Sequence, residues 1–265
     1  MLWKIEDTPH FLVGSIHVRS AKEATIPKGL IETFQLTKET VFEADVSDPR
    51  LQTFGIDPSL SHLNTQNARS LYERAANLLK TIGINQAIDS FKPWKASLAL
   101  TYHILCSQGF DFNNGIDQRL REYSLADNHT ISYLEFPLRS LQCFDSLSTD
   151  DSLKLLEEVV NNPIKLIEVI TNIITAWTQQ DLSTIGNILN SLLSEHFDLY
   201  SDFVLRRNEE WLQKLINEIL PDDTPKLVVV GALHCVGERG LTNLMLDHNI
   251  QTTIWKMHEK CDATE

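Results

Sequence analysis

Two apolar segments, each followed by Gly-x-x-His, lie near opposite ends of the chain and constrain the fold more than any other feature. One is Phe11–Val13 followed by Gly14-Ser15-Ile16-His17, and the other is Leu227–Val230 followed by Gly231-Ala232-Leu233-His234. Apolar runs of this kind are typical of strands that are buried on both faces of a sheet. We therefore expect the two ends of the chain to meet in one sheet.

The remaining pattern predicts strands toward both ends and helices in the middle. We expect strands at 2–5, 11–16, 40–46, 130–135, 226–230 and 252–255. Helical periodicity predicts helices at 27–37, 68–82, 88–108 with a break at Pro93, 115–126, 137–147, 152–160, 163–177, 182–193, 202–220 and 240–247, and residues 47–66 are expected to be rich in loops. This order predicts a single α/β domain over 1–265. Its mixed central sheet is built from N- and C-terminal strands and surrounded by helices, and residues 140–220 form a helical cap.

The charge of the chain excludes some classes of partner. There are 23 basic and 36 acidic residues, which gives a formal net charge of −13. Such a balance argues against sequence-independent nucleic-acid binding and against docking on anionic lipid. Residues 140–205 hold ten acids against two lysines. We expect this stretch to be a solvated surface of the cap, and the alternative is a docking face for a basic partner.

The sequence also carries a prediction about compartment. Its first residues show no charged leader followed by an apolar run, and no stretch approaches 18 apolar residues. We therefore expect a cytoplasmic protein with no signal peptide and no membrane span. The four cysteines are far apart and form no CxxC, which favours free thiols over disulfides. Nothing in the sequence indicates the oligomeric state.

Two histidines and one glutamate are the first candidates for chemistry. His17 and His234 each follow a buried-type strand, and ligands of open α/β sheets bind at the carboxyl ends of strands. Glu43 lies on the apolar segment at 40–46, where an acid is costly unless it is paired or binds a ligand. The alternatives are two structural histidines and an edge-strand glutamate that faces water.

A second group of polar residues could support this site. Asp117 and Glu135 each lie at the boundary of an expected element, although Asp117 could simply favour the dipole of its helix. Arg206, Arg207 and Asn208 interrupt a region that is poor in cations. One arginine could neutralise a buried acid or bind an oxyanion, and the alternative is a pair on a helix surface.

These residue types allow two kinds of hydrolytic chemistry. Two imidazoles with one or two carboxylates suit a divalent ion such as Zn, Mn, Co or Fe, which would activate a bound water. Without a metal, one histidine would act as general base on water, oriented by Glu43. The chain has no HExxH, no GxSxG and no phosphate-binding glycine loop, so zincin, α/β-hydrolase and P-loop hypotheses lack support.

In its motifs, and in their order along the chain, this protein resembles the TraB/PrgY/GumN family, which includes the Tiki proteins. The matching segments are LWKI with FLVGSIHV, VFEADVSD, GID at Gly115, YLE, Ala176-Trp177 with Asp181-Leu182, RRNEEWL at Arg206 and VVVGALHCVGERGL at Val228. The resemblance implies the mixed-sheet fold of the erythromycin-esterase and ChaN-like superfamily. It also implies His17, His234 and Glu43 as site residues. Arg207 and Asn208 match the Arg-Asn pair of the family, and Arg206 is an additional arginine.

The activity that this resemblance implies is metal-dependent hydrolysis of a peptide or amide bond, as described for Tiki proteins. Under it, His17 and His234 hold a divalent metal (Mn, Co or Zn), Glu43 is a third ligand or the general base, and Arg207 stabilises the oxyanion. The first alternative is a metal-independent esterase or amidase with His17 as general base. The second is a protein that binds a peptide pheromone or haem without turnover. The expected partner is therefore a peptide or a small molecule.

Overall fold

The computed structural model describes residues 1–23, 25–59 and 65–255, and these divide into two compact units. The sheet unit consists of the described parts of residues 1–45, 111–136 and 173–265, and the helical unit consists of the described parts of 46–110 and 137–172. Every candidate site residue belongs to the sheet unit. The assignment of 1–265 to a single domain stays a prediction.

A six-stranded mixed sheet forms the centre of the sheet unit. Its strand order is β6-β4-β7-β2-β1-β8. The neighbours β6 and β4, β4 and β7, and β7 and β2 pair in parallel, whereas β1 pairs antiparallel with both β2 and β8. The strands are β1 (Leu2–Ile5), β2 (Phe11–Ser15), β4 (Glu39–Phe42), β6 (Thr130–Tyr133), β7 (Lys226–Gly231) and β8 (Thr252–Ile254). The predicted mixed sheet, built from both ends of the chain, is confirmed.

The two Gly-x-x-His segments follow neighbouring strands. In the register of β2 and β7, Gly14 pairs with Val230 and Ser15 pairs with Gly231. Every residue of both strands is buried, as their unbroken apolar character predicted. His17 and His234 therefore follow adjacent parallel strands at the same edge of the sheet.

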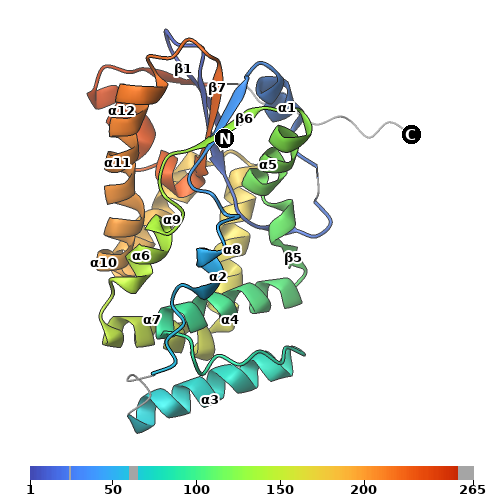
Figure 1. Cartoon of the computed structure of the whole chain (residues 1–265), viewed down its shortest axis with the longest axis vertical. Coiled ribbons are helices and arrows are strands. Elements are labelled where there is room, and N and C mark those ends of the chain that lie inside the picture. Colours follow the sequence, from blue (N-terminus) through green and yellow to red (C-terminus); the bar gives the residue numbers. More distant parts are fainter. Residues whose placement is uncertain (24, 60–64, 256–265) are drawn as a thin grey trace. The chain divides into compact units, whose positions relative to one another are not determined.

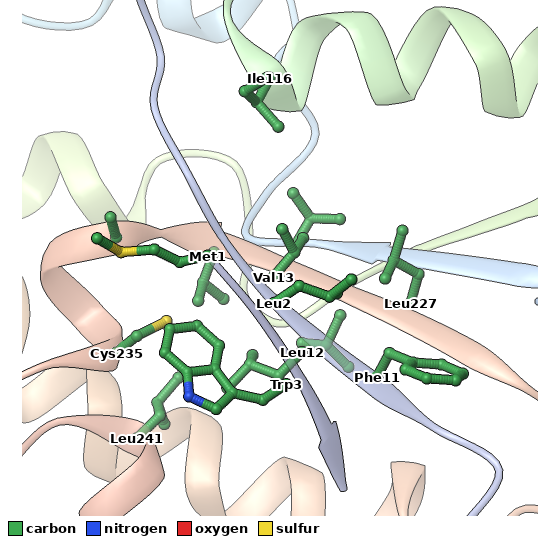
Figure 2. Packing of buried hydrophobic residues seen from close by; sticks show 14 of the residues in the cluster. Met1, Leu2, Trp3, Phe11, Leu12, Val13, Ile116, Leu227, Cys235 and Leu241 are labelled. Carbon is green, nitrogen blue, oxygen red and sulfur yellow. The ribbon is translucent and has the colours of Figure 1, made fainter. Parts of the chain in front are cut away.

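Helices of the sheet unit cover both faces of this sheet. In Figure 1, α1 (Lys28–Gln35) and α5 (Ile116–Ala126) lie on one side of the strands, and α11 (Arg207–Lys214) and α12 (Leu241–Asp247) lie on the other. Figure 2 shows the same layering in the core, because Ile116 and Leu241 lie on opposite sides of the strands. Both side chains are fully buried.

Most of the remaining helices lie close to their predicted positions, and the exceptions are 50–53 and 197–200, where no helix was expected. The sheet unit also contains α9 (Leu182–Glu195), α10 (Phe197–Tyr200) and two π-helical segments, 201–206 and 215–219, which flank α11. The helical unit contains α2 (Arg50–Thr53), α3 (Gln66–Thr81), α4 (Pro93–Ser107), α6 (Arg139–Asp145) and α7 (Thr149–Asn161), and it has an apolar core of its own. Helix α8 (Pro163–Thr178) contributes residues to both units.

Several predicted boundaries need correction. The strand expected at 40–46 ends at Phe42, so Glu43 lies just beyond β4 and not within it. The helix expected from residue 88 begins only at Pro93, which occupies the first helical position because proline needs no N–H partner there. The short strands β3 (Arg19–Ser20) and β5 (Phe110–Asp111) and helix α2 carry no periodic pattern and were not predicted.

Two further expectations concern the membrane and the cysteines. Over the described ranges, no helix has both the length and the apolar character needed to cross a bilayer. Cys106, Cys143 and Cys235 are free thiols, as predicted, and Cys261 lies outside the described residues. The cytoplasmic location stays a prediction.

Candidate functional site

The candidate residues follow the carboxyl ends of four neighbouring parallel strands. His17 comes after β2, Glu43 directly after β4, and Glu135 after β6. His234 lies on the short 3-10 turn Ala232–Cys235 that follows β7. This is the edge at which open α/β sheets bind ligands, so the topology alone gathers residues that are far apart in the sequence.

Three of these side chains meet at Gly231. A Cβ atom built on Gly231 would lie 3.4 Å from Glu43 Oε1, 3.4 Å from His17 Nε2 and 3.6 Å from His234 Cδ2. We call the space bounded by these three atoms the Gly231 cradle. The missing side chain of Gly231 leaves this space open between the polar atoms, although a Cβ there would make only ordinary van der Waals contacts.

Arg207, at the start of α11, is the centre of the buried part of the site. Its side chain is 1 % exposed. A guanidinium has five N–H donors, and all five have acceptors here. Nε donates to Glu135 at 2.9 Å, Nη1 donates to the Phe203 carbonyl at 2.9 Å and to His234 Nε2 at 3.3 Å, and Nη2 donates to Glu43 Oε2 at 2.8 Å and to Glu135 at 2.9 Å. In this arrangement no donor remains for an oxyanion, so the geometry gives Arg207 a positioning role.

Two aromatic rings and a π-helical segment hold the guanidinium in place. Its central carbon lies 4.9 Å from the ring centroid of Phe203 and 4.5 Å from that of Trp211. Both contacts are cation–π interactions, which strengthen when water is excluded. Trp211 also donates to Glu135 at 2.9 Å. Phe203 lies in the segment 201–206, and π-helical turns occur often at functional sites.

The two carboxylates that Arg207 bridges differ in their acidity. Burial raises the pKa of Glu43, but the neighbouring Arg207 charge and the other site groups outweigh it and lower that pKa to about 2. Burial also raises the pKa of Glu135, and there Arg207 offsets the shift only in part. Glu43 is therefore a permanent carboxylate at neutral pH, and Gly231 N–H donates to its Oε1 at 2.6 Å.

His234 is held as a neutral ring by Asn208 on α11. The Asn208 amide donates to the carbonyls of His234 and Arg239, at 3.1 and 2.9 Å, so its Oδ1 faces His234 Nδ1 at 2.7 Å. Nδ1 therefore carries the proton and Nε2 accepts from Arg207, an assignment that follows from the hydrogen-bond network. Burial lowers the pKa of His234 to about 3, in keeping with a neutral ring.

His17 is the exposed member of the site and contacts Asp117 in the first turn of α5. Its Nδ1 lies 3.2 Å from Asp117 Oδ1, and the two side chains are 59 % and 28 % exposed. The Asp117 charge raises the pKa of His17 to about 9, against partial desolvation of the ring. Asp117 thus orients the ring so that Nε2 points to the Gly231 cradle, which is a partnership that its place in the first turn did not reveal.

The donors do not fit the predicted three-ligand metal site. His234 directs Cδ2 toward the cradle, and the Nε2 lone pair that a metal would need accepts from the Arg207 guanidinium. Glu43 Oε2 is likewise paired with Arg207. Within the described part of the chain, no three or more His, Cys, Asp or Glu side chains are grouped so that they could hold a metal ion. The buried guanidinium supplies the positive charge that faces Glu43 Oε2 and Glu135.

Some residues differ from their expected place. Arg206 is 69 % exposed and pairs with Asp202 at 3.4 Å on the helix surface, outside the site. Phe203 and Trp211 were not singled out, although they lie one helical turn before and after Arg207, the spacing at which side chains share a helix face.

A surface cavity of about 550 Å³ is lined by residues such as Glu6, Thr8 and Leu220, and it contains none of the candidate residues.

Comparisons with known proteins agree with the motifs. The model of the TraB/PrgY/gumN family matches residues 1–254. A protein of Escherichia coli strain K12, described as uncharacterized protein YbaP, is 24 % identical over 238 residues, which are 89 % of this chain and 88 % of the relative. The YbaP protein of Shigella flexneri is 23 % identical over 235 residues, or 88 % of this chain and 86 % of that protein. No solved structure matches significantly. The chain therefore belongs to the TraB/PrgY/gumN family.

Proposed function

We propose that this protein hydrolyses an amide or ester bond of a peptide or small molecule, with His17 as general base and no metal ion in the catalytic step. One observation carries the proposal. The His17 ring contacts Asp117 through Nδ1 and faces Glu43 Oε1 across the Gly231 cradle through Nε2. A base oriented by a carboxylate is the arrangement that general-base hydrolysis requires.

The reaction needs only water and the neutral His17 ring. Nε2 removes a proton from a water molecule, and the water oxygen attacks the carbonyl carbon. The C–N or C–O bond then breaks as the protonated ring returns the proton to the leaving nitrogen or oxygen. The ring is exposed enough for substrate to reach it, whereas Arg207 and Glu135 are buried, at 1 and 5 % exposure.

The buried residues position the carboxylate that faces His17. Glu43 Oε1 accepts from Gly231 N–H and keeps a further lone pair for the second hydrogen of the attacking water. Arg207 fixes Glu43, His234 and Glu135 hold Arg207, and Asn208 holds His234. A water held between fixed partners is already oriented for attack, which lowers the entropic part of the barrier.

Hydrolysis in the presence and absence of a chelator tests this proposal. Purified protein is assayed on p-nitrophenyl acetate and on a panel of fluorogenic peptides, with and without EDTA and 1,10-phenanthroline. We expect turnover that survives chelation and is lost in His17→Ala. Metal analysis of the same samples should give far less than one equivalent of Mn, Co or Zn per chain, with no difference between wild type and the His17→Ala/His234→Ala double variant.

The metal-dependent hypothesis remains the second candidate because one observation favours it. His17 Nε2 and Glu43 Oε1 lie at equal distance from the cradle position and are two of the predicted ligands. Activity that disappears with chelator and returns with added metal would support it and contradict our proposal. Tight binding of a peptide or haem without turnover, retained in Glu43→Ala, would instead indicate a binding protein.

A further inference from the structure

Ser15, the second residue of the first Gly-x-x-His segment, has a buried hydroxyl without a partner. The residue is 1 % exposed, and its Oγ makes no hydrogen bond to any described residue. Buried hydroxyls nearly always have a partner, because leaving one unsatisfied is unfavourable. An orphaned hydroxyl in a strand that ends at the candidate site therefore requires an explanation.

The register of the sheet directs Ser15 toward the Gly231 cradle. Ser15 is the register partner of Gly231, and partners on adjacent parallel strands present their side chains to the same face. On that face the missing Cβ of Gly231 is surrounded by Glu43 Oε1 and His17 Nε2. The register thus places the Ser15 side chain on the face of the sheet where the cradle lies.

The second Gly-x-x-His segment provides an internal comparison. Its residue at the position of Ser15 is Ala232, which packs against the other strand, with its Cα 3.2 Å from a Cβ built on Gly14. The second segment, which contains the cradle glycine itself, thus has alanine where the first segment has serine. A strand end of this kind therefore folds without a hydroxyl at this position.

We propose that Ser15 is a catalytic residue whose hydroxyl holds the attacking water in the Gly231 cradle, together with Glu43 Oε1 and His17 Nε2. This inference rests on the proposed hydrolytic function and names the site of its nucleophile. A buried water typically has two to four polar partners, and these three groups supply three. Glu43 accepts one hydrogen of the water, neutral His17 accepts the other, and the Ser15 hydroxyl donates to the water oxygen.

Serine-to-alanine substitutions at two matched positions test this proposal. Ser15→Ala removes only the oxygen, and Ser152→Ala is the control, because Ser152 is also buried, at 3 %, and its Oγ also lacks a hydrogen-bond partner. Ser152 lies in α7 of the helical unit. On p-nitrophenyl acetate we expect Ser15→Ala to lower kcat roughly tenfold or more with KM within about twofold, as for loss of one hydrogen bond in a transition state. Ser152→Ala should change neither, and both variants should keep the melting temperature of the wild type.

His17→Ala, measured in parallel, separates the two proposals. If His17→Ala abolishes turnover and Ser15→Ala leaves kcat within twofold, the Ser15 proposal is wrong and the proposed function stands. If His17→Ala retains turnover, both are wrong. A crystal structure gives an answer that does not depend on activity. We expect a water within about 3.2 Å of Ser15 Oγ, Glu43 Oε1 and His17 Nε2 in the wild type, and its absence there would overturn the assignment.

Discussion

Arg207 Nη2 lies 2.8 Å from Glu43 Oε2, and this contact joins the start of helix α11 to the end of strand β4. The same guanidinium pairs with Glu135, so one buried cation balances two buried carboxylates. Replacement of Arg207 by Met leaves both carboxylates in the interior without their partner. We expect the free energy of unfolding to fall by about 3–5 kcal/mol, the usual result of removing one member of a buried ion pair. Urea denaturation followed by circular dichroism measures the change.

The neighbouring arginine is the matched control for this prediction. Arg206→Met removes the same side chain one residue earlier, from an exposed pair with Asp202. Because exposed ion pairs contribute little, we expect a change within about 0.5 kcal/mol. Equal losses in the two variants would show that Arg207 does not have the buried partners described here.

The strand-end histidines could be predicted because two simple rules act together. Apolar runs such as Leu227–Val230 specify buried strands, and the carboxyl ends of parallel strands meet at one edge. Once β2 and β7 are neighbours, His17 and His234 must lie at that edge. Glu43 could be predicted as a site residue for a second reason. An acid beside an apolar strand needs a partner.

The role of the arginines could not be predicted in the same way. Two adjacent arginines on a regular helix differ by about 100° in direction, and the sequence does not fix the phase of the helix. The π-helical segment 201–206 changes that phase just before Arg207, and nothing in the local pattern marks it. The five acceptors of Arg207 come from segments at 43, 135, 203 and 234, so only the tertiary structure shows that all its donors are used.

The contact between His17 and Asp117 predicts the pH dependence of hydrolysis. A general base acts in its neutral form, and the Asp117 charge raises the pKa of His17 to about 9. The rate should therefore rise with pH up to about 9 and then level off. Asp117→Asn removes the charge, so the rise should move toward the ordinary histidine pKa of about 6.5. The measurement is a profile of kcat/KM against pH.

A charge change elsewhere on the same helix is the control for that profile. Glu122, also on α5, pairs with Arg119 at 2.6 Å. Glu122→Gln changes the net charge by the same amount but does not touch His17, so its profile should overlay that of the wild type. A profile that Asp117→Asn leaves unchanged would exclude His17 as the titrating base.

Burial of neutral His234 predicts loss of stability in acid. The folded-state pKa is about 3, whereas an unfolded histidine has a pKa near 6.5. Below about pH 6.5 the unfolded chain takes up a proton that the folded chain does not, so the stability is full above that pH and falls as pH decreases toward 3. The slope from this one group approaches about 1.4 kcal/mol per pH unit. Glu43, with its pKa lowered to about 2, adds a further loss between about pH 4.5 and 2.

His234→Gln tests the acid prediction because glutamine keeps an amide donor and acceptor but does not titrate. Urea unfolding between pH 6 and 4 should give a slope that is smaller by about 1.4 kcal/mol per pH unit than in the wild type. The exposed His248, replaced by Gln, serves as the control and should leave the slope unchanged. If His234→Gln and the wild type have the same slope, His234 is not buried in neutral form.

Glycine-to-alanine substitutions at the two Gly-x-x-His segments separate function from stability. A Cβ on Gly231 would make ordinary contacts of 3.4 Å with Glu43 Oε1 and His17 Nε2, and the backbone angles there, φ −58° and ψ 142°, suit alanine. We expect Gly231→Ala to change stability by less than about 1 kcal/mol. It nevertheless fills the cradle, so kcat/KM should fall at least about tenfold, because the water displaced is the nucleophile.

In contrast, a Cβ on Gly14 would lie 3.2 Å from the Ala232 Cα, and backbone cannot move as easily as a side chain. Gly14→Ala should therefore destabilise the fold by about 1–3 kcal/mol. Denaturation and hydrolysis assays on both variants provide the comparison, and full activity in Gly231→Ala would show that the cradle does not hold the reacting water.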